Sequence, residues 1–502
     1  MKQQLNIIHD HKITFEGRCG NYTVLGRLAM DLSALKTTIH LSSPERRKQR
    51  LKVDLYDYSQ IQKNCINLSE KEEYNYAELE ADLLQLTDLL EQHREMIFEK
   101  EYQTEQPKRP KISLAREKEA ISLLSSKNLL ITLNSMIGEA GIIGEDSNRL
   151  LTFLAGLSYK CANPLHVLIQ SNSGSGKSHL INSVANCFPP EDIISFSRVT
   201  SKSLYHYRKG ELLNKLVLIQ DFDGLDQEAL FALRELQSYG SLSSSVTFKD
   251  RFGSLTSRVQ TVEGHFASFG ATTKTVYTDN ESRSILLRID ESIEQTNKII
   301  AFQNELNLGI KDKKQIANAQ LELSNLIRQL KPKKIVNPLS TRIVLPFKAK
   351  MIRRLNQQFQ DFISVITYLH QYQRETDEEG RIITTEEDVK NAIELFFESI
   401  WLKIDELDGS LRKFFEQLKA FIQKEERDTF NQREIRQELN ISKSHCHRMI
   451  KTLLELEYIK VVAGSSTRGY TYKIEYWDEF NKDREAIKQG LLNQLKAKGV
   501  RA

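Results

Sequence analysis

The sequence predicts an α/β protein whose central unit is a parallel sheet covered by helices on both faces. Three observations support this fold class. Short apolar runs (HVLIQ, KLVLIQ, HFASFG and SILLRI) are separated by helical segments between about residues 163 and 292, as buried parallel strands are. A glycine- and serine-rich loop joins the first run to an amphipathic helix. A compact basic segment near the C-terminus reads as three helices followed by a β-ribbon.

Length and composition limit the class of protein. A chain of 502 residues exceeds what one hydrophobic core usually organises, so we expect three or four structural units. With 71 Lys and Arg against 67 Asp and Glu, the net charge of +4 leaves any nucleic-acid contact to local clusters. No apolar run reaches the roughly 18 residues that span a bilayer, and the N-terminus is too charged for a signal peptide. The five scattered cysteines have neither zinc spacing nor a disulfide pattern, so we expect a cytoplasmic protein without a membrane partner.

The N-terminal region predicts strands and then a helix. Residues 12 to 57 alternate apolar and polar side chains in three runs, KITFEG, LKTTIHLSS and RLKVDLYDY. A helix is expected from about Glu70 to Lys100, with leucines at 79, 83, 86 and 90 on one face. The proline-containing segment from Thr104 predicts a linker.

The loop in PLHVLIQSNSGSGKSHLINSV is the strongest chemical motif. A strand, a Gly/Ser loop and a helix in this order point backbone N–H groups and the positive end of the helix dipole at one position, which favours a phosphate. Lys177 is expected to reach the β- and γ-phosphates of ATP, and the Ser178 hydroxyl to bind Mg²⁺. Ser171 stands where such loops usually open with glycine. The expected nucleotide-binding residues of the loop are Ser173, Gly174, Ser175, Gly176, Lys177, Ser178 and His179.

The next two strands end in groups suited to hydrolysis. The strand Leu216–Ile219 leads into Gln220-Asp221-Phe222-Asp223, and carboxylates at this position hold Mg²⁺ and orient the attacking water. Asp221 is the candidate for one of these roles, in catalysis and metal binding, and Asp223 for the other. FASFGATTK brings Thr272 and Thr273 to the end of a third strand, where a hydroxyl polarises the water or contacts the γ-phosphate.

The order of these motifs resembles the AAA+ ATPases, and within them the minichromosome maintenance (MCM) replicative helicases and their mobile-element relatives. The MCM motif Ile-Asp-Glu-Phe-Asp aligns with Ile219 to Asp223, which places Gln220 at the metal-side aspartate and Asp221 at the catalytic glutamate. Both positions differ, so the resemblance leaves the rate of hydrolysis open. Ser282-Arg283 is similar to the context of the MCM arginine finger, which enters a neighbouring subunit's site.

The resemblance implies further elements. LRELQSYGSLSSSVTFKDRFGSLTSRVQTVEG resembles the MCM helix and β-hairpin whose basic tip grips DNA, with Lys249, Arg251 and Arg258 at the matching positions. KAKMIRRLNQQF resembles the start of the AAA+ lid, where Arg353 or Arg354 is the candidate sensor of the γ-phosphate. Residues 12 to 100 are similar to the region before the ATPase in primase–helicase fusions, whose zinc-binding and primase domains are lacking here, so no primer synthesis is expected.

The C-terminal segment predicts a winged helix-turn-helix. Asn431 is placed to cap the second helix, and the third helix is the one that enters the major groove in such domains. Ile450, Leu453 and Leu454 are expected to face the core. The candidate DNA contacts are Lys443, His447, Arg448 and Lys451 on the third helix and Arg468 near the wing tip.

These inferences predict an α/β fold with a P-loop AAA+ core, a helical lid, a small N-terminal α/β domain and a C-terminal winged helix. The expected function is an ATP- and Mg²⁺-dependent motor on single- or double-stranded DNA, a mobile-element helicase in a homo-oligomeric ring that meets replication proteins. Two alternatives are an ATP-switched DNA-binding adaptor, such as a helicase loader or transcription regulator, and a nucleotide-stabilised scaffold without a DNA role. The expected domains are 1–103 (N-terminal), 104–145 (linker and helices), 146–330 (ATPase core), 331–410 (lid), 411–478 (winged helix) and 479–502 (charged tail).

Overall fold

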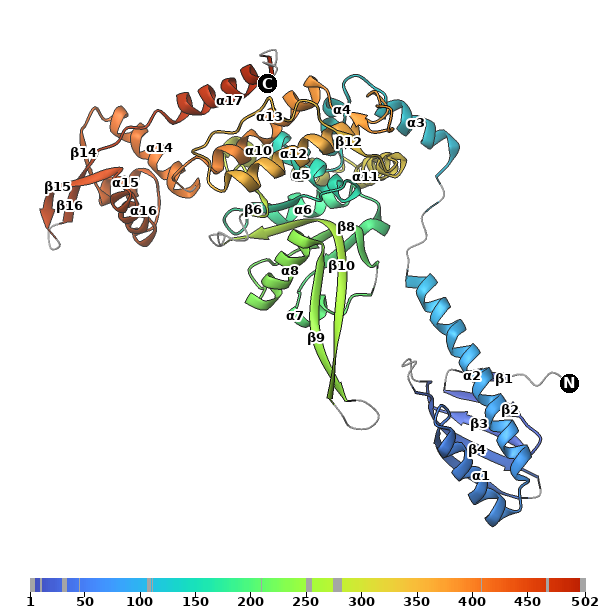
Figure 1. Ribbon diagram of the computed structural model, residues 1–502. Helices are drawn as coiled ribbons and strands as arrows, with labels where there is room; N and C mark the ends of the chain where they lie inside the picture. Colours follow the sequence, from blue (N-terminus) through green and yellow to red (C-terminus); the bar gives the residue numbers. More distant parts are fainter. Residues whose placement is uncertain are drawn as a thin grey trace. The chain divides into compact units, whose positions relative to one another are not determined.

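The chain forms two compact units, residues 1–109 and 110–502, which are described separately. The computed structural model (Figure 1) describes residues 5–9, 11–28, 34–44, 46–105, 110, 112–208, 210–249, 255–273, 282–407, 409–465 and 469–496. For residues 98–105, 201, 246–249, 255, 256, 258 and 260 the description covers the backbone alone.

The N-terminal unit is an antiparallel sheet with two helices on one face. Its strands follow one another in chain order: β1 (Leu5–His9), β2 (Lys12–Glu16), β3 (Asn21–Leu25), β4 (Lys36–Ser43) and β5 (Arg46–Asp54). Alternate side chains, including Phe15, Tyr22, Ile39 and Leu51, form a core with the two helices, as period-two patterning requires. The helices are α1 (Tyr58–Glu72) and α2 (Tyr76–Glu105).

The single helix expected from Glu70 to Lys100 is wrong in its start and its continuity. Helix α1 begins earlier because the Asp57 side chain accepts a hydrogen bond from the Ser59 amide and caps it. It ends at Glu72, and the left-handed φ of 57° at the next residue, Glu73, reverses the chain before α2. The four leucines expected on one face of the helix are all buried in the core of the unit.

The buried carboxylate of Asp82 joins α2 to the turn between β2 and β3. It accepts hydrogen bonds from the amides of Arg18 and Cys19, each at 2.9 Å, and from the Tyr22 hydroxyl at 3.0 Å. We expect Asp82→Ala to lower the stability of this unit by about 3 kcal/mol, because three donors lose their partner. Hydrogen exchange of residues 12–55 in the full chain measures this loss. Asp88→Ala, an exposed change on the same helix, should leave exchange unaltered.

The second unit is built around a parallel sheet. Helices α3 (Leu114–Leu124), α4 (Leu129–Glu139) and α5 (Asp146–Leu157) precede it. The sheet has the order β11 (Ile285–Leu287), β6 (His166–Gln170), β10 (Leu255–Thr272), β8 (Leu212–Ile219) and β7 (Ile193–Phe196), all parallel. Because β10 lies between β6 and β8, the carboxyl end of β10 is next to the ends of both.

Strand β10 belongs to two structures at once. Its first half pairs in antiparallel fashion with β9 (Ser241–Lys249), which forms the hairpin expected after α8 (Gln227–Tyr239). Its second half, from Gly264, runs in the parallel sheet. The register shifts between His265 and Phe266, opposite Asn214, which has a left-handed φ of 55°. Figure 1 shows the hairpin as a long two-stranded ribbon that leaves the sheet.

The helices that follow the sheet share its hydrophobic core. They are α10 (Ile293–Asn307), α11 (Lys313–Gln329), α12 (Ile352–Leu369) and α13 (Glu386–Leu402), with two short parallel strands, β12 (Ile335–Val336) and β13 (Ile382–Ile383). Phe359, Phe362 and Phe396 belong to the same core as Val167 and Phe269 of the sheet. Within the described residues, no helix is both long and apolar enough to cross a bilayer.

The C-terminal part contains three helices, a small antiparallel sheet and one further helix. The helices are α14 (Gly409–Lys424), α15 (Gln432–Glu438) and α16 (Lys443–Glu455), and the sheet has the order β14 (Thr429–Asn431), β16 (Gly469–Ile474) and β15 (Ile459–Ser465). Asn431 caps α15 as expected. Residues 479–502, expected as a charged tail, contain α17 (Phe480–Lys496), whose Leu491 and Leu495 are buried in the core around the parallel sheet.

Candidate functional site

The phosphate-type loop lies between β6 and α6 (Lys177–Ala185), as its sequence predicts. Gly174 and Gly176 have φ values of 80° and 99°, a region in which a side chain is strained, so glycine is needed for this path. Gly176 also occupies the N-cap of α6. The loop therefore ends at the positive end of a helix dipole, where a phosphate is favoured.

Polar groups of the loop are available to a ligand. In the described part of the chain, the amides of Gly174, Gly176, Lys177 and Ser178 donate no hydrogen bond. The Ser175 hydroxyl oxygen is buried and lacks a partner among the described residues, and Ser178 is exposed. Unpaired buried polar groups are costly and call for a partner. These donors fit a nucleoside triphosphate, and the exposed hydroxyl of Ser178 fits its Mg²⁺.

Lys177 lies across the opening of the loop. Its side chain is buried, and Nζ donates to the carbonyl oxygens of Ser171 at 2.8 Å and Asn172 at 2.5 Å. Burial lowers the pKa of Lys177, while the negative charges of Glu291 and Asp223 oppose this shift. The ammonium group is thus held by neutral carbonyls and is available to a stronger anionic partner.

Asp223 is the carboxylate that joins the ends of β8 and β10. It accepts hydrogen bonds from the Thr272 hydroxyl and from the Thr273 amide and hydroxyl, at 2.8 and 2.7 Å for the last two. Thr272 is buried, and its carbonyl oxygen accepts the Ser171 amide at 3.3 Å. The predicted threonines, one of the two predicted carboxylates and the loop are thus brought together at one edge of the sheet.

Gln220 and Asp221 make other contacts. The Gln220 side-chain amide donates to Ser195 on β7 at 3.3 Å, and β7 lies on the side of β8 away from β6. The exposed Asp221 carboxylate accepts the Gly224 amide at 3.0 Å and closes its own turn. The expected catalytic and metal-binding position, Asp221, therefore has a turn-forming contact, whereas Asp223 is the residue linked to the threonines.

Glu291 is a contact of the loop that sequence reasoning missed. Its carboxylate accepts hydrogen bonds from the Ser171 hydroxyl and from Asn172, whose side-chain nitrogen lies 3.1 Å away. Burial raises the pKa of Glu291, but the hydrogen bonds from Ser171 and Asn172 and the charge of Lys413 outweigh it, so the pKa is lowered overall. The serine in place of an opening glycine thus has a partner 120 residues away.

We expect Glu291→Gln to tighten Mg²⁺–ATP binding about three- to tenfold. The change removes a negative charge from the neighbourhood of the triphosphate while it keeps an acceptor for Ser171. Calorimetric titration measures the affinity. Glu294→Gln removes an exposed charge three residues away and should have little effect, and equal gains from both variants would contradict a local role of Glu291.

The remaining predicted nucleotide contacts have their described partners outside the loop. His179 is exposed, with Nε2 3.3 Å from the Gly141 carbonyl oxygen. Arg283 donates from Nε to the Ser238 hydroxyl of α8 at 2.7 Å. Arg354 donates to the Ser282 hydroxyl, whereas Arg353 is exposed and has no polar partner among the described residues. Arg353 and Arg354 were both candidates for the lid sensor, and Arg354 is the one hydrogen-bonded to Ser282, the residue before Arg283.

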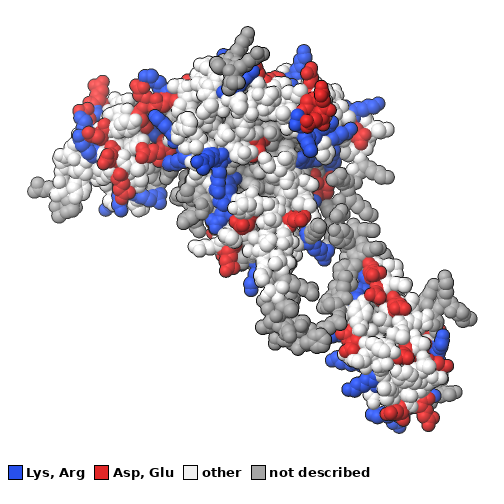
Figure 2. All heavy atoms as spheres, in the orientation of Figure 1, with Lys and Arg blue, Asp and Glu red and all other residues white. Residues whose placement is uncertain are grey.

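The predicted DNA contacts are only partly described. Arg251 and Arg468 lie outside the described residues, as do the side chains of Lys249 and Arg258. On α16, four predicted side chains are exposed, while Cys446, Met449, Ile450 and Leu453 are buried; Leu454, expected in the core, is half-buried. The exposed four are Lys443, His447, Arg448 and Lys451. On the face shown in Figure 2, positive and negative side chains are interspersed, so no charge patch extends over that whole face.

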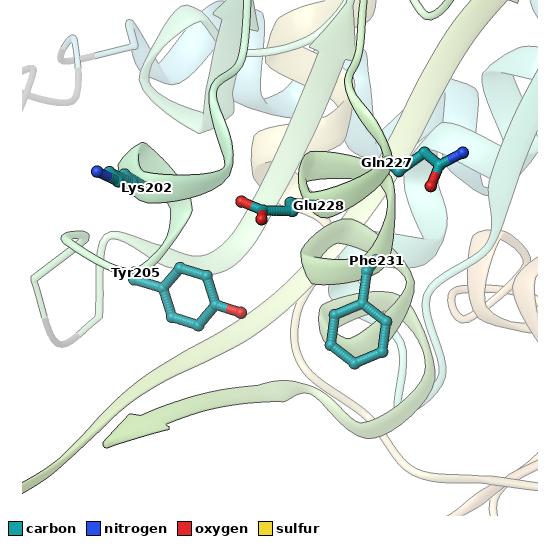
Figure 3. A pocket seen from close by; sticks show the side chains of 5 residues that line it. All are labelled: Lys202, Tyr205, Gln227, Glu228 and Phe231. Atoms are coloured by element: carbon teal, nitrogen blue, oxygen red, sulfur yellow. The ribbon is translucent and has the colours of Figure 1, made fainter. Parts of the chain in front are cut away.

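A hollow of about 280 Å³ lies apart from the loop residues, between α7 (Ser201–Leu204) and α8. In Figure 3, Glu228 extends from α8 toward α7, with the rings of Tyr205 and Phe231 nearby. Lys202 and Gln227 complete the lining. None of these residues belongs to the predicted nucleotide site.

Comparison with known proteins supports the chemistry of the loop. A family model described as the MTBMA_p00010 P-loop domain matches residues 114–241, about a quarter of the chain, from α3 to the start of β9. No curated protein matches the sequence. The match supports a P-loop domain that binds nucleotide, usually with Mg²⁺, and hence an activity driven by nucleoside triphosphate.

Proposed function

We propose that the chain is an ATP-dependent motor that moves along DNA, a replicative-type helicase of a mobile genetic element. The observation that carries the proposal is the cluster of Lys177, Asp223, Thr272 and Thr273 at the carboxyl edge of the sheet. Thr272 is the last residue of β10, the strand that also forms the hairpin. In this proposal Lys177 and the loop amides hold the triphosphate. Ser178 and Asp223 hold Mg²⁺, which stabilises the negative charge on the phosphates.

The DNA-related part of the proposal draws on two elements. The β9–β10 hairpin is continuous with the strand that ends at Thr272, so a contact on the hairpin is linked to the nucleotide site by one segment of backbone. Helices α14 to α16 with the small C-terminal sheet have the order of a winged helix, and α16 presents exposed basic side chains. AAA+ architecture with a lid, a homo-oligomeric ring completed by Arg283 from a neighbour, and replication partners belong to the same proposal.

The test is strand displacement on forked DNA with ATP and Mg²⁺. The proposal requires unwinding that depends on hydrolysis and an ATPase rate that rises when DNA is added. Hydrolysis without unwinding, on forks with either a 5′ or a 3′ tail, would contradict the helicase activity while leaving the P-loop domain in place.

An ATP-switched DNA-binding adaptor is the second candidate, and the contacts of Gln220 and Asp221 favour it. With Gln220 bonded to β7 and Asp221 to its own turn, Asp223 is the one carboxylate from the end of β8 that contacts the threonines. Such a site suits slow turnover. The adaptor predicts DNA affinity that changes between ATP and ADP, with no strand displacement. A scaffold without a DNA role predicts no DNA binding at low salt.

A further inference from the structure

The N-terminal sheet has one face without a helix in the described part of the unit. Side chains at alternate positions, such as Leu51 and Val53 on β5, are buried against α1 and α2. The side chains between them therefore lie on the opposite face. On β5 these are Lys48, Arg50 and Lys52, and all three are exposed.

This open face carries a cluster of cations that spans the sheet. Backbone register places Arg50 opposite His40 of β4, and His40 opposite Thr23 of β3. Lys48, Arg50 and Lys52 recur every second residue, about 6.6 Å apart along the strand. Two further exposed lysines, Lys12 on β2 and Lys36 on β4, occupy alternate positions whose side chains also lie on the open face.

The charges on this face are not neutralised by neighbours. None of its five lysines and arginines forms an ion pair with a described residue. Two acidic residues, Glu16 on β2 and Asp54 on β5, occupy positions on the described part of the open face. The Asp54 carboxylate accepts hydrogen bonds from the amides of Leu35 and Tyr56. The pKa of His40 is lowered, first by burial and then by the positive charges of Lys48 and Arg50, which places those charges close to the centre of the face.

Charge differs between the segment that contains the strands and the segment that contains the helices. Residues 5–54, which form the sheet, have nine Lys and Arg against five Asp and Glu, whereas residues 58–105, which form the helices, have four against twelve. A polyanion is therefore attracted to the open sheet face and repelled from the helical side. Thr14, Thr23, Thr38 and Asn21 add hydroxyl and amide groups, which commonly donate to phosphate oxygens.

We propose that the open face of the N-terminal sheet, formed by Lys12, Lys36, Lys48, Arg50 and Lys52, binds the phosphate backbone of a nucleic acid. In the described part of this face the ring side chains are two histidines, His40 and His9, the second of which lies opposite Lys12, and there is no Phe, Tyr or Trp. Base stacking therefore contributes little, and recognition is independent of sequence. This binding does not depend on the ATPase, and it gives the chain a nucleic-acid contact in a unit separate from the parallel sheet.

The experiment compares two charge reversals of equal size in the full chain. Arg50→Glu with Lys52→Glu changes the open face, and Lys63→Glu with Lys71→Glu changes exposed lysines of α1 on the helical side. Both are made in the Lys177→Ala background and assayed without nucleotide, so that the outcome is separate from that of the proposed motor. Fluorescence anisotropy with a labelled duplex and a labelled single strand, over a series of salt concentrations, reports affinity.

The open-face variant is expected to bind at least tenfold more weakly at low salt. The slope of log affinity against log salt should become shallower by about 1.8 for the duplex or about 1.4 for the single strand, because two phosphate contacts are lost. The helical-side variant should retain both affinity and slope. Equal losses in the two variants, or an unchanged slope in the first, would overturn the proposal. Loss of binding to phosphatidylserine vesicles or polyglutamate with nucleic-acid affinity intact would also overturn it, in favour of a lipid or acidic protein partner.

Discussion

Lys177→Ala is expected to abolish Mg²⁺–ATP binding at concentrations that saturate the unchanged protein. In the free protein the ammonium group is bonded to two loop carbonyls, and a triphosphate offers it charged oxygens in their place. Two hydrogen bonds to charged groups contribute about 3–6 kcal/mol, so their loss lowers affinity by about two to four orders of magnitude. Calorimetric titration with Mg²⁺–ATP measures the change directly, and ATP turnover and unwinding should disappear together.

Two controls separate this effect from damage to the fold. Thermal unfolding without nucleotide should move little in Lys177→Ala, because the residue's hydrogen bonds are to carbonyls at the loop surface. Lys177→Arg keeps the charge but replaces a compact ammonium with a larger planar group, so it should not restore binding. Unwinding that persists in Lys177→Ala would contradict the proposed motor. Unaltered nucleotide affinity would show that Lys177 does not contact the nucleotide.

Asp223→Asn is expected to lower ATP turnover by about 10²- to 10³-fold while affecting nucleotide affinity much less. The Asp223 carboxylate accepts three hydrogen bonds from Thr272 and Thr273 and contributes to the field at Lys177. An amide has one acceptor oxygen and no charge, so the threonine hydroxyls lose a fixed orientation, and the proposed Mg²⁺ site would lose a negatively charged group. The magnitude is that of losing one preorganised charge-stabilising group. Steady-state turnover with saturating Mg²⁺–ATP is the measurement.

Asp221→Asn is the matched control. Among the described residues its carboxylate accepts only the Gly224 amide, and the amide oxygen of asparagine replaces that acceptor. Turnover should therefore change less than about threefold. If Asp221→Asn is the more damaging of the two, the catalytic role returns to the position that the family resemblance indicates, and the Asp223 cluster is structural.

The sequence predicted the parts of the fold that depend on local pattern. Strand, loop and helix around Lys177 follow from an apolar run, two glycines and an amphipathic helix. The hairpin after α8 was expected from the resemblance to the MCM helix and hairpin. The boundary between α1 and α2 was missed because Glu73 adopts a left-handed conformation without being glycine or asparagine. Helix α17 was missed because its sequence is mostly charged and polar, and its two buried leucines, Leu491 and Leu495, pack into a core formed by residues far away in the sequence.

The site depends more strongly on contacts between distant residues. Asp221 and Asp223 are chemically equivalent in the sequence, and the turn at Gly224 together with the neighbouring threonines distinguishes them. Glu291 has no local motif, so its contact with Ser171 appears only when β11 is placed beside β6. The unusual serine at the loop opening was the one available signal, because a hydroxyl there calls for an acceptor.

The continuity of β10 has a mechanical consequence. Its 18 residues extend about 60 Å without an intervening loop, and an extended backbone resists stretching. Force applied to the β9–β10 hairpin is thus transmitted along the backbone of β10 to Thr272 at its other end. Bending is expected near Gly264, next to the shift in strand register between His265 and Phe266. If the chain is the proposed motor, an inserted residue at that joint is expected to lower the movement along DNA per ATP hydrolysed while leaving the affinity for nucleotide and for DNA intact.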